Sequence, residues 1–106
     1  MRDIIMEKHE TDEQGNPAGG TTSGRGFTIQ WQNGPLRVNG TRREPSGAFV
    51  EDVIAAALGR LQAYQATKFH CRENALAITK LEETLHWLDH RTQNRERRGV
   101  EGTYNV

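Results

Sequence analysis

The most regular pattern in this chain is a spacing of three and four residues between hydrophobic positions, the period of one face of an α-helix. The first run with this spacing consists of Val50, Val53, Ile54, Ala57, Leu58, Leu61 and Tyr64. Ser46 precedes the run and can cap the free backbone N–H groups of a first helical turn. The pattern predicts a helix from about residue 47 to about residue 66.

A second run predicts a longer helix, because Ile78, Leu81, Leu85 and Leu88 alternate spacings of three and four. It extends from about residue 71 to about residue 98, where Gly99 can cap its C-terminal end and nearby arginines favour the helix dipole. The segment between the two runs is long enough only for a tight connection. We therefore predict two antiparallel neighbouring helices.

The N-terminal third carries the signals of strands and turns. Residues 27–32 alternate apolar and polar side chains and end at Asn33-Gly34-Pro35, which predicts a strand followed by a turn. The apolar residues 4–6 favour a short strand within Met1–Glu10. Residues 11–26 contain Gly15-Asn16-Pro17 and Gly19-Gly20, so we expect a loop there.

These elements predict an α+β fold, with a small N-terminal antiparallel sheet and a long antiparallel two-helix hairpin. We expect residues 1–26 to be an extension, residues 27–106 to be one ligand-binding domain, and the tail at residues 99–106 to be docked. A chain of 106 residues with 34% hydrophobic residues forms a marginal core. Assembly as a homo-oligomer would bury more apolar surface.

Composition narrows the class of protein. Lys+Arg and Asp+Glu balance at 14 each, so a general nucleic-acid or membrane-surface binder is disfavoured and any anion site must come from local clustering. Cys71 is the one cysteine and the four histidines lack zinc-ligand spacing, so we expect neither a disulfide nor a metal site. The absence of a membrane-spanning run or a signal peptide favours a soluble intracellular protein.

Polar residues continue the apolar stripe of the second helix at both ends. At about 100° per residue, Asn74 lies in line with Ile78, and Thr92 and Arg95 extend the stripe at the other end. Such groups are candidates for lining a pocket at a subunit junction. Tyr64 and Asn74 flank the predicted turn, whereas Arg91 and Arg95 lie about 25 Å further along the helix. An antiparallel dimer would bring the two groups together, but one protomer would not.

Four sequence blocks resemble the phage-encoded Thoeris anti-defence type 1 family, whose helical hairpin is related to that of the type 2 anti-CBASS sponges. They are Phe27–Pro35 (FTIQWQNGP), Phe49–Val53 (FVEDV), Arg72–Leu81 (RENALAITKL) and Arg91–Thr103 (RTQNRERRGVEGT). The resemblance covers roughly residues 27–104.

The resemblance implies a protein that is not an enzyme and that acts in the host bacterial cytoplasm without a cofactor. Members of this family bind cyclic ADP-ribose isomers, such as 1''-2' or 1''-3' glycocyclic ADP-ribose, and hold them intact, so that the Thoeris effector is not activated. Some also bind cyclic di- or trinucleotides as hexamers, which suggests an action against CBASS as well. The partners implied are such a cyclic nucleotide and further copies of the chain, as a homodimer or hexamer.

The resemblance also implies site residues. In the family an aromatic side chain stacks on the base, an asparagine contacts the ligand and two arginines grip its phosphates. These roles fall on Tyr64, Asn74, Arg91 and Arg95. A further arginine comes from the loop before the first helix, for which the candidates, in order, are Arg43, Arg42 and Arg37. The chemistry agrees, because guanidinium groups bind phosphate oxygens in pairs and aromatic rings stack on bases.

Other interpretations remain open at the level of sequence. The arginines also fit a solvated helix end, Tyr64 a packing residue and Asn74 a partner of nearby backbone groups. Glu82, Glu83 and His86 could instead serve a cyclic-nucleotide hydrolase. A third alternative is a small phage module that binds nucleic acid or protein through its arginines, although the neutral overall charge counts against it.

Overall fold

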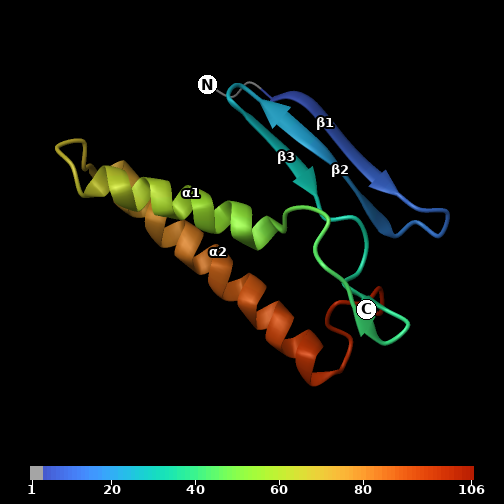
Figure 1. The fold of residues 1–106 in the computed structure, drawn as a ribbon. Helices are drawn as coiled ribbons and strands as arrows, with labels where there is room; N and C mark the ends of the chain where they lie inside the picture. Colours follow the sequence, from blue (N-terminus) through green and yellow to red (C-terminus); the bar gives the residue numbers. More distant parts are fainter. Residues whose placement is uncertain (1–3) are drawn as a thin grey trace. The chain divides into compact units, whose positions relative to one another are not determined.

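The structure is a computed structural model that describes residues 4–106; residues 1–3 of the predicted first strand lie outside it. The described chain has a three-stranded antiparallel sheet, a two-stranded ribbon and two helices (Figure 1). The predicted α+β class, with an N-terminal sheet and a helical hairpin, is confirmed. The chain divides into two compact units. The sheet unit comprises residues 4–49 and 100–106, and the hairpin unit comprises residues 50–99.

The sheet has the strand order β1-β2-β3, and both pairings are antiparallel. Its strands are β1 (Ile4–Thr11), β2 (Pro17–Gly24) and β3 (Phe27–Trp31). The turn between β1 and β2 forms around Gly15, as predicted, with a φ of 81° at that residue. The Asp12 carboxylate accepts hydrogen bonds from the backbone N–H groups of Asn16 and Gln14, each at 2.9 Å. The hydrogen bond from the Asn16 backbone is the main cause of the lowered pKa of Asp12.

The prediction of a loop over residues 11–26 is wrong, because β2 occupies half of that segment. One glycine of this segment, Gly20, serves close strand packing. At Gly20, which has a φ of 133°, an added Cβ atom would lie 2.0 Å from the carbonyl oxygen of Lys8 on β1. A residue with a side chain could not take this position without moving the neighbouring strand. Glycine therefore allows the pairing of β1 with β2.

Trp31 on the edge strand β3 connects to the central strand β2. Its indole Nε1–H donates to the hydroxyl of Thr22 at 2.8 Å, and Thr22 on β2 is only 7% exposed. Because the indole N–H and the hydroxyl bond to each other, burying them carries no penalty for an unpaired polar group. Within residues 4–106 no hydrophobic side chain reaches full burial, so the sheet unit is held by strand pairing and polar contacts more than by an apolar core.

The segment before the first helix runs beside β3 as an isolated parallel bridge between Trp31 and Ala48. The backbone of Ala48 donates to Gln30 and accepts from Gln32, at 2.7 and 3.0 Å. Ser46 does not cap the helix, contrary to our prediction; its hydroxyl accepts from the backbone N–H of Asn33 at 3.1 Å. Because this segment pairs with β3, the helix begins at Val50 instead of about residue 47.

A short ribbon and the C-terminal tail form the rest of the sheet unit. The ribbon pairs β4 (Arg37–Val38) with β5 (Thr41–Arg42). The Arg37 backbone donates to the carbonyl oxygen of Gly102 at 2.8 Å, and the Tyr104 hydroxyl donates to that of Pro17 at 2.9 Å. The expected docking of the tail is thus confirmed within this unit.

The hairpin unit consists of α1 (Val50–Gln65) and α2 (Arg72–Arg97). Cys71 caps α2, with its sulfur accepting from the backbone N–H of Asn74 at 3.4 Å. Gly99 follows the other end of α2 with a φ of 72°, as expected for a C-terminal capping glycine. The Gln65 side chain closes the turn, because its amide bonds both the N–H and the carbonyl of Cys71 at 2.9 and 3.0 Å.

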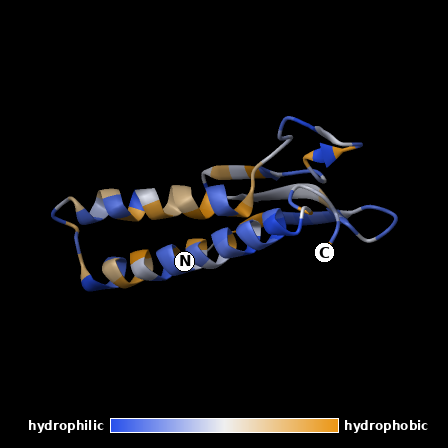
Figure 2. Cartoon of the chain, turned by 90° about the horizontal axis from the view of Figure 1, so that it is seen from below, coloured by the Kyte–Doolittle hydropathy of each residue, from blue (hydrophilic) through white to orange (hydrophobic). Residues whose placement is uncertain are grey.

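On both helices most of the partly covered residues lie in one line, at alternating spacings of three and four. On α1 the line is Glu51, Ile54, Leu58, Leu61 and Gln65, and on α2 it is Asn74, Ile78, Leu81, Leu85, Leu88, Thr92 and Arg95. Each line is apolar in the middle and polar at its ends, and Figure 2 shows hydrophobic and hydrophilic segments alternating along both helices.

Neither helix, as described, contains a fully buried residue. Val50, Leu76 and Trp87 are 50%, 47% and 60% exposed, so apolar surface remains outside the contact between α1 and α2. One hairpin alone therefore leaves much of its apolar surface exposed to water. This agrees with the marginal core expected from composition.

Two glycine substitutions should have opposite effects on stability. Gly20→Ala combines a positive φ with a steric conflict against β1, so we expect a loss of about 3 kcal/mol or more in the free energy of unfolding. Gly59→Ala, on α1, meets nothing within 4 Å. It should stabilise the hairpin by about 0.5–1 kcal/mol. Chemical denaturation followed by circular dichroism measures both, and a neutral Gly20→Ala would contradict the observed strand pairing.

Candidate functional site

The open end of the hairpin, where α1 begins and α2 ends, carries two of the predicted phosphate-binding arginines. Arg91 and Arg95 are one helical turn apart on α2, so they share a face. Arg91 is exposed, whereas Arg95 is half-buried at the end of the α2 line. The arrangement places two arginines one turn apart at the same end of the hairpin, which suits an anion with several oxygens.

Glu51 is a residue of this end that our sequence analysis missed. Its carboxylate lies 3.6 Å from the guanidinium of Arg91, and its side chain is 30% exposed against 62% for Arg91. Glu51 lies in the first turn of α1, so antiparallel packing brings it opposite the last turns of α2. The sequence signal was present, since an acidic first turn on one helix faces a basic last turn on the other.

The turn end of the hairpin holds the predicted aromatic and amide groups. The Tyr64 ring is 41% exposed, and the guanidinium of Arg60 lies 4.9 Å from its centroid. The Asn74 backbone N–H takes part in the cap of α2, but within the described chain the Asn74 side-chain amide forms no hydrogen bond. The interpretation of Asn74 as a mere partner of backbone groups is therefore not supported for its side chain.

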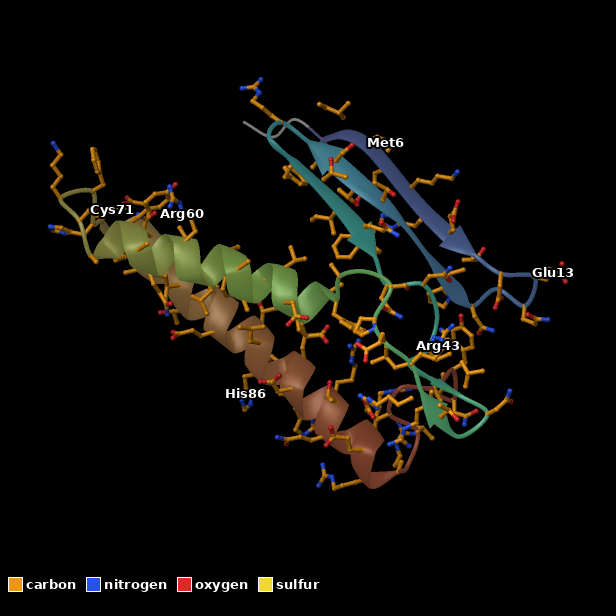
Figure 3. The ribbon with its side chains drawn as sticks, in the orientation of Figure 1. Met6, Glu13, Arg43, Arg60, Cys71 and His86 are labelled. Carbon is orange, nitrogen blue, oxygen red and sulfur yellow. The ribbon has the colours of Figure 1, made fainter. Side chains whose placement is uncertain are left out.

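The two groups of predicted residues are far apart within one chain. Asn74 and Arg91 lie on the unbroken helix α2, about 25 Å apart at 1.5 Å per residue. Figure 3 shows Arg60 and Cys71 together at the turn end, with His86 much further along α2. One hairpin thus carries Tyr64 and Asn74 at its turn end and Arg91 and Arg95 at its open end, but does not join the two pairs.

The structure distinguishes the arginines that precede the first helix. The Arg42 guanidinium donates to both carboxylate oxygens of Glu101, at 3.0 and 3.1 Å, and Arg37 approaches the same carboxylate at 3.8 Å. Arg43 instead donates to the carbonyl oxygens of Pro35 and Asn33, at 2.7 and 3.5 Å. No carboxylate in the described chain pairs with Arg43, so its charge remains available. This favours Arg43 over Arg42 as the contributing arginine.

The residues named for a hydrolase lie on the exposed surface of α2. Glu83 forms an ion pair with Lys80 at 3.7 Å, and the His86 ring meets that of Trp87 edge to face at 5.5 Å. Over residues 4–106 no three His, Cys, Asp or Glu side chains gather as they would to hold a metal ion. Nor does this part of the chain contain a helix that combines the length and apolar character needed to cross a membrane.

The ion pairs around Glu101 should hold the tail more than they stabilise the fold. Glu101→Gln removes the bidentate partner of Arg42. The side chains of Arg37 and Arg42 are 46% and 52% exposed, so we expect the free energy of unfolding to change by less than about 1 kcal/mol. Amide hydrogen exchange in residues 100–104 should become faster. Glu83→Gln is the matched control, because it removes an exposed ion pair on α2. Unchanged exchange in the tail would show that Glu101 does not hold it.

Two comparisons with known proteins identify the family. A model of the family described as "Acb2/Tad1, hairpin domain" matches residues 26–93, which include both helices of the hairpin almost completely. The chain is 50% identical over 82 residues to a protein of Bacillus phage SBSphiJ7 named Thoeris anti-defense 1, covering 77% of this chain and 55% of that protein. The chain thus spans about half the length of this relative. The resemblance seen in the sequence is confirmed, and the chain belongs to the Acb2/Tad1 hairpin-domain family.

Proposed function

We propose that this protein is a phage anti-defence protein that binds a cyclic nucleotide immune signal in the host cytoplasm and holds it without cleaving it. The proposed ligand is a cyclic ADP-ribose isomer such as 1''-2' or 1''-3' glycocyclic ADP-ribose, and cyclic di- or trinucleotides are further candidates. Family membership and the name of the phage relative support this class of function. The relative is longer, so the proposal concerns the part that the two proteins share.

The observation that carries the proposal is the division of the hairpin into two unlike ends. The turn end presents the exposed Tyr64 and the amide of Asn74, and the open end presents Arg91 and Arg95. A cyclic ADP-ribose isomer has the complementary chemistry, namely an adenine and a pyrophosphate. Stacking on an aromatic ring contributes about 1 to 3 kcal/mol per base, and charge-assisted hydrogen bonds to phosphate about 1.5 to 3 kcal/mol each.

The distance between the ends leads to a shared site. In our proposal two hairpins pack antiparallel, so that Tyr64 and Asn74 of one chain meet Arg91 and Arg95 of the other. The exposed apolar residues of the hairpin supply the surface for that packing. The family resemblance adds an arginine from the loop before α1, for which Arg43 is the first candidate. The assembly would be a homodimer or a hexamer of such dimers.

The carboxylate of Glu51 fits this proposal as a substitute anion. Arg91 is paired with Glu51 across the hairpin. The pyrophosphate of the proposed ligand, taken as a whole, offers more oxygens and more charge than one carboxylate, so it can replace Glu51 on the guanidinium. The pairing with Glu51 would keep the Arg91 side chain ordered before the ligand arrives, which reduces the entropy lost on binding.

Sequestration predicts that the ligand disappears from solution and returns unchanged. Mixing the protein with 1''-3' glycocyclic ADP-ribose should deplete the free nucleotide, and heating should release it intact, as measured by liquid chromatography with mass spectrometry. Native mass spectrometry with a panel of cyclic nucleotides would report subunit count and bound ligand together. Recovery of a cleaved product would support a hydrolase instead. Binding that falls steeply with salt and shows no preference for small cyclic nucleotides would support a nucleic-acid module.

The arginine assignments predict a graded series of affinities. Arg91→Ala or Arg95→Ala should weaken binding at least about a hundredfold, because each removes charge-assisted hydrogen bonds to phosphate. Arg43→Ala should weaken it more than Arg42→Ala, since Glu101 already holds Arg42. Isothermal titration calorimetry gives the affinities and native mass spectrometry checks that the oligomer survives. Lys80→Ala is the control for removing a helix charge, and wild-type affinity in both Arg91→Ala and Arg95→Ala would refute the assignment.

A further inference from the structure

We propose that Arg60 is a positioning residue that holds the Tyr64 ring ready to stack on the ligand. The inference rests on the proposed function, because it assumes that Tyr64 receives the base. Arg60 itself is not among the residues that the resemblance points to. What singles it out is a pair of contacts with Tyr64 that together constrain the ring.

The two residues lie four positions apart on α1, where side chains on one helix face meet. The Arg60 guanidinium carbon lies 4.9 Å from the centroid of the Tyr64 ring, and the Nε–H donates to the Tyr64 hydroxyl at 3.2 Å. The first contact fixes the distance between guanidinium and ring, and the second fixes the position of the hydroxyl. A ring held at two points cannot rotate freely between staggered conformers.

The constraint matters because Tyr64 lacks the packing that usually fixes an aromatic side chain. The residue is 41% exposed, so surrounding side chains do not enclose the ring. An exposed side chain normally changes conformer within nanoseconds, and ordering it when a ligand binds costs free energy. Because Arg60 orders the ring in the free protein, less free energy is lost when the ligand binds. The exposed part of the ring remains open for a base.

Charge adds a second consequence. Arg60 is the one basic residue in the sequence of α1, whose first turn is acidic. Its guanidinium lies beside the proposed base-stacking group, so the ligand meets positive charge at the turn end as well as at the open end. A cation on one side of an aromatic ring is itself a favourable contact, which keeps Arg60 in place when the ligand arrives.

The experiment uses the full chain with 1''-3' glycocyclic ADP-ribose as the probe. Arg60→Met keeps the aliphatic stem and removes the charge and the donor, and Lys80→Met is the matched control for loss of an exposed helix charge. We expect Arg60→Met to weaken binding about 3- to 10-fold, as a cation–π contact and one hydrogen bond together predict. Lys80→Met should change affinity less than about 2-fold.

A readout without ligand isolates the positioning role. In the free protein, Arg60→Met should increase the mobility of the Tyr64 ring, measured by carbon-13 relaxation of its aromatic carbons, while Lys80→Met should not. Tyr64→Phe removes the hydroxyl and leaves the ring. In that background Arg60→Met should weaken binding less than it does in the wild type, because one of its two contacts is already gone.

The binding results distinguish an error in the role of Arg60 from an error in the role of Tyr64. If Tyr64→Ala abolishes binding and Arg60→Met leaves it unchanged, the role of Arg60 is wrong and the proposed function stands. If Arg60→Met weakens binding while ring mobility stays as in the wild type, Arg60 contacts the ligand directly and the positioning role is overturned. If Tyr64→Ala binds normally, the stacking role of Tyr64 is wrong, and the inference about Arg60 is overturned with it.

Discussion

The length of α2 is the constraint on which the proposed function depends. The helix runs without a break from Arg72 to Arg97, so the groups at its two ends are held apart by the rise of the backbone itself. Side-chain movement spans only a few ångströms and cannot close such a gap. A small ligand that contacts the residues of both ends must therefore be bound between two chains. In this view the hairpin fixes the spacing of the recognition groups, and assembly would bring them together.

The hairpin could be predicted from sequence because its signal is local and repeated. Leu81, Leu85 and Leu88 lie one helical turn apart, and each supports the same face, so a single exception would not change the prediction. The strand β2 could not be predicted, since a glycine alone does not show whether it serves a flexible loop or a close approach. At Gly20 the difference lies in the position of the Lys8 carbonyl on another strand. Such information is tertiary and leaves no pattern in neighbouring residues.

The candidate site divides in the same way. The polar ends of the α2 line, Asn74 and Arg95, follow from helical spacing, and the structure shows both partly covered as expected. The partners of the arginines do not follow from spacing, because Glu51 reaches Arg91 across the hairpin and Glu101 reaches Arg42 from the tail. The contact of Arg60 with Tyr64 is intermediate. Its four-residue separation is visible in the sequence, but the sequence does not say that the two side chains meet.

The acidic partners also bear on selectivity in the proposed site. Arg91 and Arg42 each face a carboxylate, so neither is an open cation that any anion would neutralise. A simple anion gains little by replacing a carboxylate that is already in place, because both offer similar charge and the carboxylate loses no translational freedom. The proposed cyclic nucleotide gains more, since the same molecule would also stack on Tyr64 and bond to Asn74. Internal counter-ions would thus convert a general affinity for anions into a requirement for a phosphate and a base at a fixed separation.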